Sequence, residues 1–201
     1  MHGNSDGTAP PEKSILKIAK FRYVLLTNPS QKVPDIFQYT LTRNQNVNPE
    51  AFQRLPAARH QIASGYKKYF EKIKKLGAVT AMDFSTELDS EIIDVVGPYL
   101  DYAFFSFEEG DKKLENFMKD IYQRIKGMVV VTRGEEGSVV YDGKEFIYHG
   151  IEPCEVVDTL GAGDSFIAGF LYGMSEGLSI KESMIKGAKN SSVTIGYKGA
   201  W

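Results

Sequence analysis

The stretch Val157-Asp-Thr-Leu-Gly-Ala-Gly-Asp-Ser-Phe-Ile-Ala-Gly-Phe170 decides the fold of this chain. It reads as a strand end at Glu155–Val157 that runs into a turn of small residues and then opens a helix. Gly161 and Gly163 leave no side chain between the backbone and a ligand, so successive N–H groups can point at one anion. The helix dipole adds favourable potential at the same point. We therefore expect an anion-binding turn at the start of this helix.

Asp164 stands at the start of the same helix and has two interpretations. Beside an electrophilic phosphoryl group, its carboxylate can accept the proton of an attacking hydroxyl. Alternatively, Asp164 only caps the helix and the glycines only make the turn. These residues taken alone favour neither interpretation.

Upstream of this stretch, strand and helix signals alternate from Ser64 onward. Short apolar runs predict strands, and apolar residues at helical spacing predict helices. The expected strands cover 78–82, 102–105 and 128–132, and the expected helices cover 64–76, 91–96 and 111–125. Alternation at this spacing indicates parallel pairing with right-handed crossovers, which is an α/β layered fold.

The pattern changes on either side of this alternating part. Residues 138–141 and 145–148 flank a turn and predict a β-hairpin. Two helices are expected at 163–176 and 179–195, the second opened by a capping box of Ser179 and Glu182. Residues 1–63 contain many Asn and Gln, and only 23–27 reads as a strand there. We therefore divide the chain into residues 1–63, partly irregular or foreign, and a domain at 64–201.

The segment Asp158-Thr-Leu-Gly-Ala-Gly-Asp164, followed by an aromatic residue, Ala168 and Gly169, resembles the C-terminal signature of the ribokinase-like (PfkB-type) carbohydrate kinases. The preceding strand and loop of that family resemble Val129-Val-Val-Thr-Arg-Gly-Glu-Glu-Gly137. The resemblance implies a three-layer α/β/α, Rossmann-like ribokinase fold with a mostly parallel sheet, a β-hairpin and an incomplete N-terminal part. It implies ATP-dependent phosphoryl transfer to a hydroxyl of a sugar or a sugar–amine conjugate.

The same resemblance implies roles for individual residues. Asp164 is implied to be the catalytic base, and the turn that begins at Gly161 is implied to hold the γ-phosphoryl group through the amides of Ala162, Gly163 and Asp164. Asp158 and Thr159 match positions beside which relatives often hold a monovalent cation. The resemblance therefore implies K⁺ as a further cofactor. ATP with Mg²⁺ is the implied cofactor pair.

The nucleotide is implied to lie along a loop and under a C-terminal segment. The loop runs from Thr132 through Gly134 to Gly137, and in relatives it lies along the phosphates. Asn190 and Gly199 match the region that closes over adenine. A solvated helix position is the alternative interpretation of Asn190.

Two features depart from the family pattern. Relatives commonly carry Asn-x-x-Glu, tied to magnesium and phosphate, where this chain has Ser106-Phe-Glu-Glu109. Glu109 stays in register as a candidate Mg²⁺ residue acting through water, although an acid at a helix start explains it equally well. The Gly-Gly motif, acceptor-binding residues and β lid of relatives are not recognisable in residues 1–63. We therefore expect poor catalysis, an uncovered sheet edge and, because such an edge favours self-association, a possible homodimer.

Short matches at 82–85, 101–106 and 196–201 look like the fructoselysine (fructosamine) 6-kinase branch, which makes a sugar or fructosamine the expected substrate. A truncated nucleotide-binding fragment, or a pseudokinase without an acceptor site, is the alternative. A third interpretation, a nucleic-acid-binding module, draws on the 13 basic against 5 acidic residues up to Lys75. Much of that excess lies on the polar side of the predicted helix at 64–76, so a solvated face is favoured and no nucleic-acid partner is expected.

Composition bounds the remaining possibilities. The single cysteine, Cys154, excludes an internal disulfide and fits a reducing compartment. Residues 1–12 are polar and do not resemble a signal peptide, and the longest apolar stretch, Phe166–Met174, is too short to span a bilayer. We therefore expect a cytoplasmic protein that does not bind membranes.

Overall fold

The computed structural model describes the backbone of residues 22–26 and 37–39, and residues 67, 70, 71, 74, 75, 77–108 and 110–199. Within these residues a seven-stranded sheet has the order β2-β1-β3-β4-β5-β6-β7. The strands are β1 Arg22–Leu26, β2 Phe37–Tyr39, β3 Val79–Asp83, β4 Tyr102–Ser106, β5 Met128–Thr132, β6 Ser138–Tyr141 and β7 Phe146–His149.

Parallel pairing is confined to the three central strands. β4 lies between β3 and β5, with Met82 opposite Ala103 and Phe104 opposite Val130. β6 and β7 add the antiparallel hairpin that the sequence predicts. The predicted parallel arrangement of 78–82, 102–105 and 128–132 is confirmed. The other four strand pairings among the described residues are antiparallel, so the sheet is mixed, which corrects the expectation of a mostly parallel sheet.

The outer edge of β3 is covered, which corrects the expectation of an uncovered edge. β1 pairs antiparallel with all of β3, from Leu26 opposite Val79 to Arg22 opposite Asp83. β2 in turn pairs antiparallel with β1. β1 is the apolar run that the sequence already predicts as a strand, and β2 pairs with it through backbone N–H and C=O groups, which need no apolar periodicity. The strand expected at 23–27 is confirmed over 23–26, and Thr27 lies outside the described residues.

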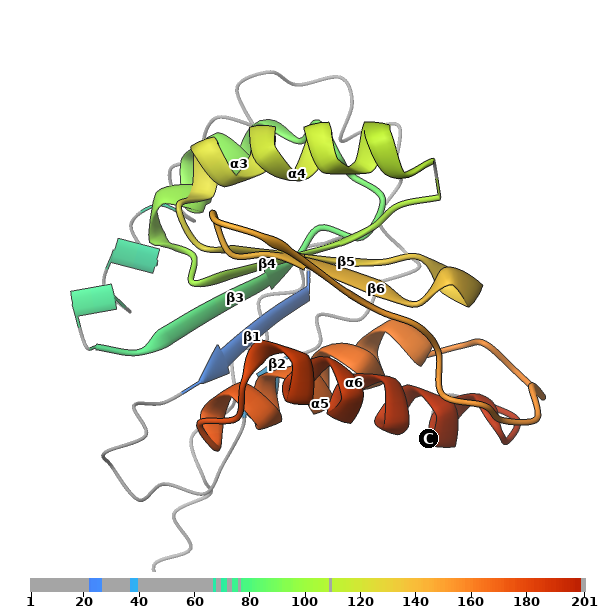
Figure 1. The fold of residues 1–201 in the computed structure, drawn as a ribbon. Coiled ribbons are helices and arrows are strands. Elements are labelled where there is room, and N and C mark those ends of the chain that lie inside the picture. Colours follow the sequence, from blue (N-terminus) through green and yellow to red (C-terminus); the bar gives the residue numbers. More distant parts are fainter. Residues whose placement is uncertain are drawn as a thin grey trace, which may run out of the picture.

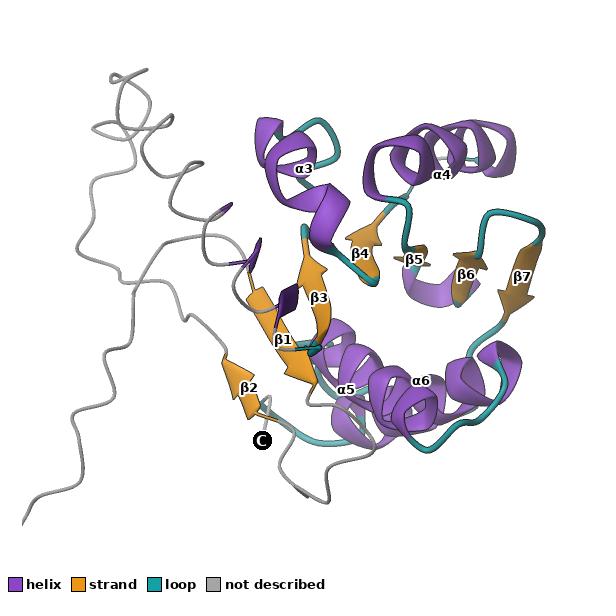
Figure 2. Cartoon of the chain, turned by 90° about the vertical axis from the view of Figure 1, so that its left-hand side faces the viewer, coloured by secondary structure: helices purple, strands orange, loops and turns teal. Residues whose placement is uncertain are grey.

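Helices cover both faces of the sheet and make three layers (Figures 1 and 2). α3 (Glu91–Val96), the short 3₁₀ helix η1 (Gly97–Tyr99) and α4 (Asp111–Ile125) lie on one face. α5 (Ala162–Ser175) and α6 (Ile180–Ile195) lie on the other. The described residues of the predicted helix at 64–76 are helical, and the others lie outside the described part of the chain.

Alternate residues of each central strand supply two hydrophobic cores. Along β4, Phe105 packs with α3 and α4, whereas Phe104 packs against Phe170 of α5. The three middle residues of β3, β4 and β5 are buried, as strands covered on both faces require. These cores fix the sheet against its helices and so set where the strand ends lie.

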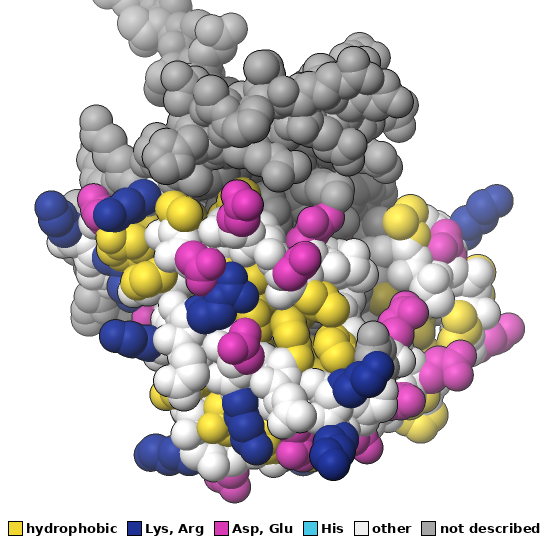
Figure 3. Space-filling view, turned by 90° about the horizontal axis from the view of Figure 1, so that it is seen from above, with side chains coloured by type: hydrophobic (Ala, Val, Ile, Leu, Met, Phe, Trp, Pro, Cys, Tyr) yellow, Lys and Arg dark blue, Asp and Glu magenta, His cyan; other side chains and the backbone are white. Residues whose placement is uncertain are grey.

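The outer face of α3 and α4 carries interspersed acidic and basic side chains with apolar patches between them (Figure 3). None of the helices in the described ranges combines the length and the apolar character that a membrane crossing requires.

Candidate nucleotide-binding and catalytic site

The start of α5 is built around two glycines. Gly161 has a φ of 81°, a left-handed conformation that glycine adopts without strain, and it precedes the first helical residue. Gly163 is exposed, and a Cβ added there would meet no atom within 4 Å. Asp164, half-buried, is the third residue of the helix. Open space therefore lies in front of the backbone at Gly163, where the sequence predicts an anion.

One of the predicted anion-binding amides already has a partner. The N–H of Ala162 donates to the carbonyl of Thr159 at 3.2 Å, at the long end of the usual range. The N–H of Ser165 donates to the carbonyl of Gly161 at 2.9 Å and starts the regular helix. The amides of Gly163 and Asp164 lie between these two bonds, at the positive end of the helix dipole.

The last turns of α6 hold the first turn of α5 in place. Asn190 donates from Nδ2 to the carbonyl of Ser165 at 2.7 Å, and the Ser191 hydroxyl donates to the carbonyl of Ala162 at 3.0 Å. The hydroxyls of Ser165 and Thr194 are 2.6 Å apart. Sequence reasoning singled out Asn190 and missed the three hydroxyl residues, because serine and threonine in a helix give no signal of a partner in another helix.

The two helices approach closely at a glycine. A Cβ at Gly169 would lie 2.7 Å from the carbonyl oxygen of Lys186 and 2.9 Å from the Cα of Gly187. Glycine therefore lets the backbones meet, and this contact brings the end of α6 beside the start of α5. The capping box of Ser179 and Glu182 that opens α6 is confirmed.

Asp158 ties the turn before α5 to the segment after α6. Its Oδ1 accepts the N–H of Leu160 and its Oδ2 accepts the N–H of Gly199, both at 3.0 Å. The two N–H donors, Leu160 first, lower the pKa of Asp158 below its ordinary value. The arrangement joins Asp158, predicted to lie beside a cation, to Gly199, predicted to lie near adenine. Thr159 is exposed on the same turn.

The segment before this turn is irregular, which corrects the expected strand end at Glu155–Val157. The N–H of Val157 donates to the carbonyl of Ile195 in α6 at 2.8 Å, so it bonds to a helix end and not to a neighbouring strand. Apolar side chains stand exposed around this junction: Val156, Val157, Leu160, Val193 and Tyr197. They form an apolar surface beside the start of α5.

A second group of site residues lies where β4 and β5 end. Ser106 and Thr132 are paired in the register of these strands, and their hydroxyl oxygens are 3.3 Å apart. Ser106, the first residue of the Ser-Phe-Glu-Glu segment, therefore lies directly beside Thr132, the first residue of the predicted phosphate loop. Glu109, the acid expected to act on Mg²⁺, lies outside the described residues.

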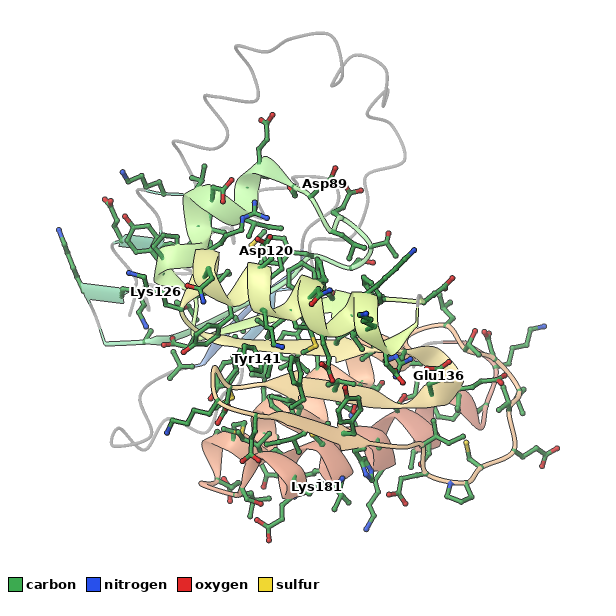
Figure 4. All side chains as sticks on the ribbon, turned by 45° about the horizontal axis from the view of Figure 1, so that its top comes forward. Asp89, Asp120, Lys126, Glu136, Tyr141 and Lys181 are labelled. Carbon is green, nitrogen blue, oxygen red and sulfur yellow. The ribbon has the colours of Figure 1, made fainter. Side chains whose placement is uncertain are left out.

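The loop after Thr132 adopts a conformation that favours glycine at two positions. It contains the 3₁₀ helix η2 (Gly134–Glu136), with Gly134 at φ 54° and Gly137 at φ 88°. A Cβ at Gly137 would lie 2.1 Å from the carbonyl oxygen of His149, so the end of the loop packs closely against the end of β7. Figure 4 shows Glu136 of this loop at the end of the molecule opposite Lys126, which precedes β5.

Both groups of residues lie at one end of the molecule. β7 ends beside Gly137, so the segment 150–161 leaves the sheet where β5 ends, and α5 starts from there (Figure 1). Among the described residues, no three His, Cys, Asp or Glu side chains are grouped closely enough to hold a metal ion.

Comparison with known proteins places this architecture in a family. The model of the pfkB family of carbohydrate kinases matches residues 63–201. Fructoselysine 6-kinase of Shigella flexneri is 45% identical over 132 residues, which cover 66% of this chain and 51% of the relative. A fructosamine kinase of Bacillus subtilis is 34% identical over 122 residues, covering 60% of this chain and 43% of the relative. The chain spans about half the length of the curated relatives it matches.

Solved structures agree with the family match. Ribokinase of Arabidopsis thaliana, complexed with ribose and ATP, is similar with a TM-score of 0.60 and 25% identity over 69% of this chain and 48% of that one. Adenosine kinase of Sinorhizobium meliloti has a TM-score of 0.59 and 29% identity over 68% of this chain and 45% of that one. The ribokinase-like fold is thus confirmed, and the chain belongs to the pfkB family of carbohydrate kinases.

Proposed function

We propose that this chain forms the nucleotide-binding and catalytic part of an ATP-dependent kinase that phosphorylates a sugar–amine conjugate of the fructosamine class. The observation that carries the proposal is the start of α5, where Gly161 turns the backbone and Gly163 leaves open space before the helix. Backbone amides at a helix start stabilise phosphoryl oxygens. The family match supports assigning these oxygens to ATP.

In this proposal Asp164 is the general base. It takes the proton of the acceptor hydroxyl as the hydroxyl oxygen bonds to the γ-phosphorus and the bond to the bridging β–γ oxygen breaks, which releases ADP. The amides of Gly163 and Asp164, and that of Ala162 if it exchanges its long bond to Thr159, stabilise the transferred group. Mg²⁺, when bound, neutralises phosphate charge, and Glu109 is its candidate residue.

The rest of the nucleotide extends from this point in two directions. We assign the phosphates to the loop from Thr132 through Gly134 to Gly137, beside the end of β5. The base lies on the exposed apolar surface near Asn190 and Gly199. A monovalent cation beside Asp158 and Thr159 completes the proposal, because the Asp158 carboxylate keeps its negative charge while it accepts two N–H groups.

The acceptor class follows from the relatives. The two proteins that match at 45% and 34% identity are named as a fructoselysine and a fructosamine kinase. We therefore assign fructosamines to this chain ahead of simple sugars. A cytoplasmic location fits the exposed free thiol of Cys154.

The test is titration calorimetry with MgATP, followed by detection of ADP release with fructoselysine, fructose or ribose. We expect saturable MgATP binding and slow turnover that fructoselysine stimulates most. Turnover is expected to be slow because holding an acceptor accounts for roughly 7–11 kcal/mol of barrier lowering, and residues 1–63 show no acceptor-binding pattern. A chain that binds no MgATP would contradict the proposal, and equal stimulation by all three acceptors would contradict the fructosamine assignment.

A further inference from the structure

Arg133 is a buried cation inside the proposed phosphate loop, yet its charge is already paired. Its side chain is only 8% exposed, and Nη1 donates to Oδ1 of Asp111 at 2.7 Å. Nη2 pairs with the carboxylate of Glu136, three residues on in the same loop. The guanidinium therefore faces two carboxylates, which pair its charge without a phosphate, while its Nε is buried without a hydrogen-bond partner.

The partner Asp111 matters because of where it stands. It is the first residue of α4, which begins two residues after Glu109 and packs Leu114 and Met118 into the core. The Arg133–Asp111 pair thus links the phosphate loop to the helix that follows the strand end at Ser106. At its other end the loop presses on β7 through Gly137. The loop is held at both ends.

We infer that Arg133 is a positioning residue for the nucleotide phosphates: it fastens the phosphate loop to the start of α4 through Asp111 and does not itself bind phosphate. The inference rests on the proposed function. A planar guanidinium fork that meets two carboxylates fixes a loop better than a flexible ammonium group does. A loop fixed before binding loses less conformational entropy when the phosphates arrive.

The inference predicts which part of the nucleotide is affected. The loop lies along the phosphates, so loosening it weakens binding of MgATP and leaves binding of adenosine unchanged. A general loss of folding would weaken the binding of MgATP and of adenosine alike. A direct phosphate contact makes the opposite prediction for Asp111→Asn, because removing the competing carboxylate would free the guanidinium and tighten MgATP binding.

The experiment compares Arg133→Met, Asp111→Asn and the double variant in the full chain, with MgATP and adenosine as ligands. Met keeps the aliphatic stem of arginine in its buried place. The matched controls are Arg124→Met and Asp94→Asn, which break another Arg–Asp pair, 2.6 Å long, between α4 and α3. Arg133→Lys keeps the charge but not the fork. Urea unfolding of each variant runs in parallel.

We expect both single variants to weaken MgATP binding about tenfold, with the double variant no weaker than the worse single one, as for residues that act through one contact. The MgATP affinity of Arg133→Lys should lie between those of the parent and Arg133→Met. The control variants should bind both ligands as the parent does. An Asp111→Asn variant that binds MgATP with unchanged or higher affinity overturns the inference. An equal loss of affinity for adenosine overturns it as well. If Arg133→Met does not fold, Asp111→Asn and Arg133→Lys decide alone. A parent chain that binds no MgATP refutes the proposed function, and this inference with it.

Discussion

The carboxylate of Asp158 accepts the backbone N–H of Gly199 across 41 residues of sequence. With its second oxygen it accepts the N–H of Leu160, so one side chain joins the turn before α5 to the segment after α6. Both segments belong to the proposed nucleotide site. The bond therefore couples the shape of the site to the protonation state of one acid.

We expect this coupling to depend on pH. The pKa of Asp158 lies below its ordinary value of 3.8, so the carboxylate stabilises the fold above that pH and its contribution is lost as the pH falls through the lowered pKa. Asp158→Asn, which leaves a single acceptor oxygen, should be less stable than the parent in urea unfolding at pH 7. The difference between the two proteins should shrink as the pH falls below 3.8 and disappear below the lowered pKa. A stability difference that persists unchanged into acid would contradict this account.

The glycines of the phosphate loop give a matched pair of substitutions. Gly134 and Gly137 both have positive φ, but only Gly137 has no room for a side chain. Gly134→Ala should cost about 1 kcal/mol of unfolding free energy for the left-handed backbone alone. Gly137→Ala should cost about 3 kcal/mol or more, because its Cβ would overlap the His149 carbonyl. Equal losses of unfolding free energy for the two variants in chemical denaturation would show that the loop end at Gly137 does not pack closely against β7.

Tyr148 of β7 reports on the same region. Partial desolvation and the hydrogen bond from its hydroxyl to Glu115 of α4 raise the pKa of Tyr148, whose side chain stays partly exposed, to about 12. The neutral phenol therefore stabilises the fold fully below the ordinary tyrosine pKa of 10.0, and this contribution is lost as the pH rises through about 12. In ¹³C-NMR of labelled tyrosine, assigned with Tyr148→Phe, the Tyr148 signal should titrate near pH 12. Glu115→Gln should lower that pKa, and a titration near 10 in the parent would contradict the contact.

Binding and chemistry separate at Asp164. Asp164→Asn keeps the shape of the side chain and removes the base. MgATP affinity should stay within about twofold, while the residual rate of ADP release with fructoselysine should fall at least about 10²-fold, the range for loss of a general base. Asp120→Asn, an exposed change on α4, is the control. Equal rates in Asp164→Asn and parent would leave Asp164 only a structural role at the helix start.

Local signals made most of the fold predictable. The helix expected at 111–125 has those bounds, the strand expected at 102–105 extends by one residue to Ser106, and the Ser179 capping box lies where expected. Each of these elements is set by periodicity or by residues three or four apart. β2 and the irregular course of Glu155–Val157 were not predictable, because each depends on a backbone partner distant in sequence.

The site was predictable as a set of positions and not as a set of contacts. The glycines around Asp164 and the loop after Thr132 follow from sequence motifs. The ion pair of Arg133 with Asp111 and the bond of Asp158 to Gly199 join residues 22 and 41 positions apart, and no spacing rule announces them. Small residues in α5, such as Gly169, were the available signal that α5 and α6 meet closely.

The central claim is that phosphoryl oxygens bind in the open space before Gly163, and Gly163→Ala tests it most directly. The position is helical and a Cβ meets no atom within 4 Å, so the unfolding free energy should stay equal or rise by up to about 1 kcal/mol. The added methyl group would occupy the space assigned to the ligand, so calorimetry should show MgATP affinity at least about tenfold weaker, which corresponds to roughly 1.4 kcal/mol. A Gly163→Ala chain as stable as the parent that binds MgATP with unchanged affinity would contradict the account.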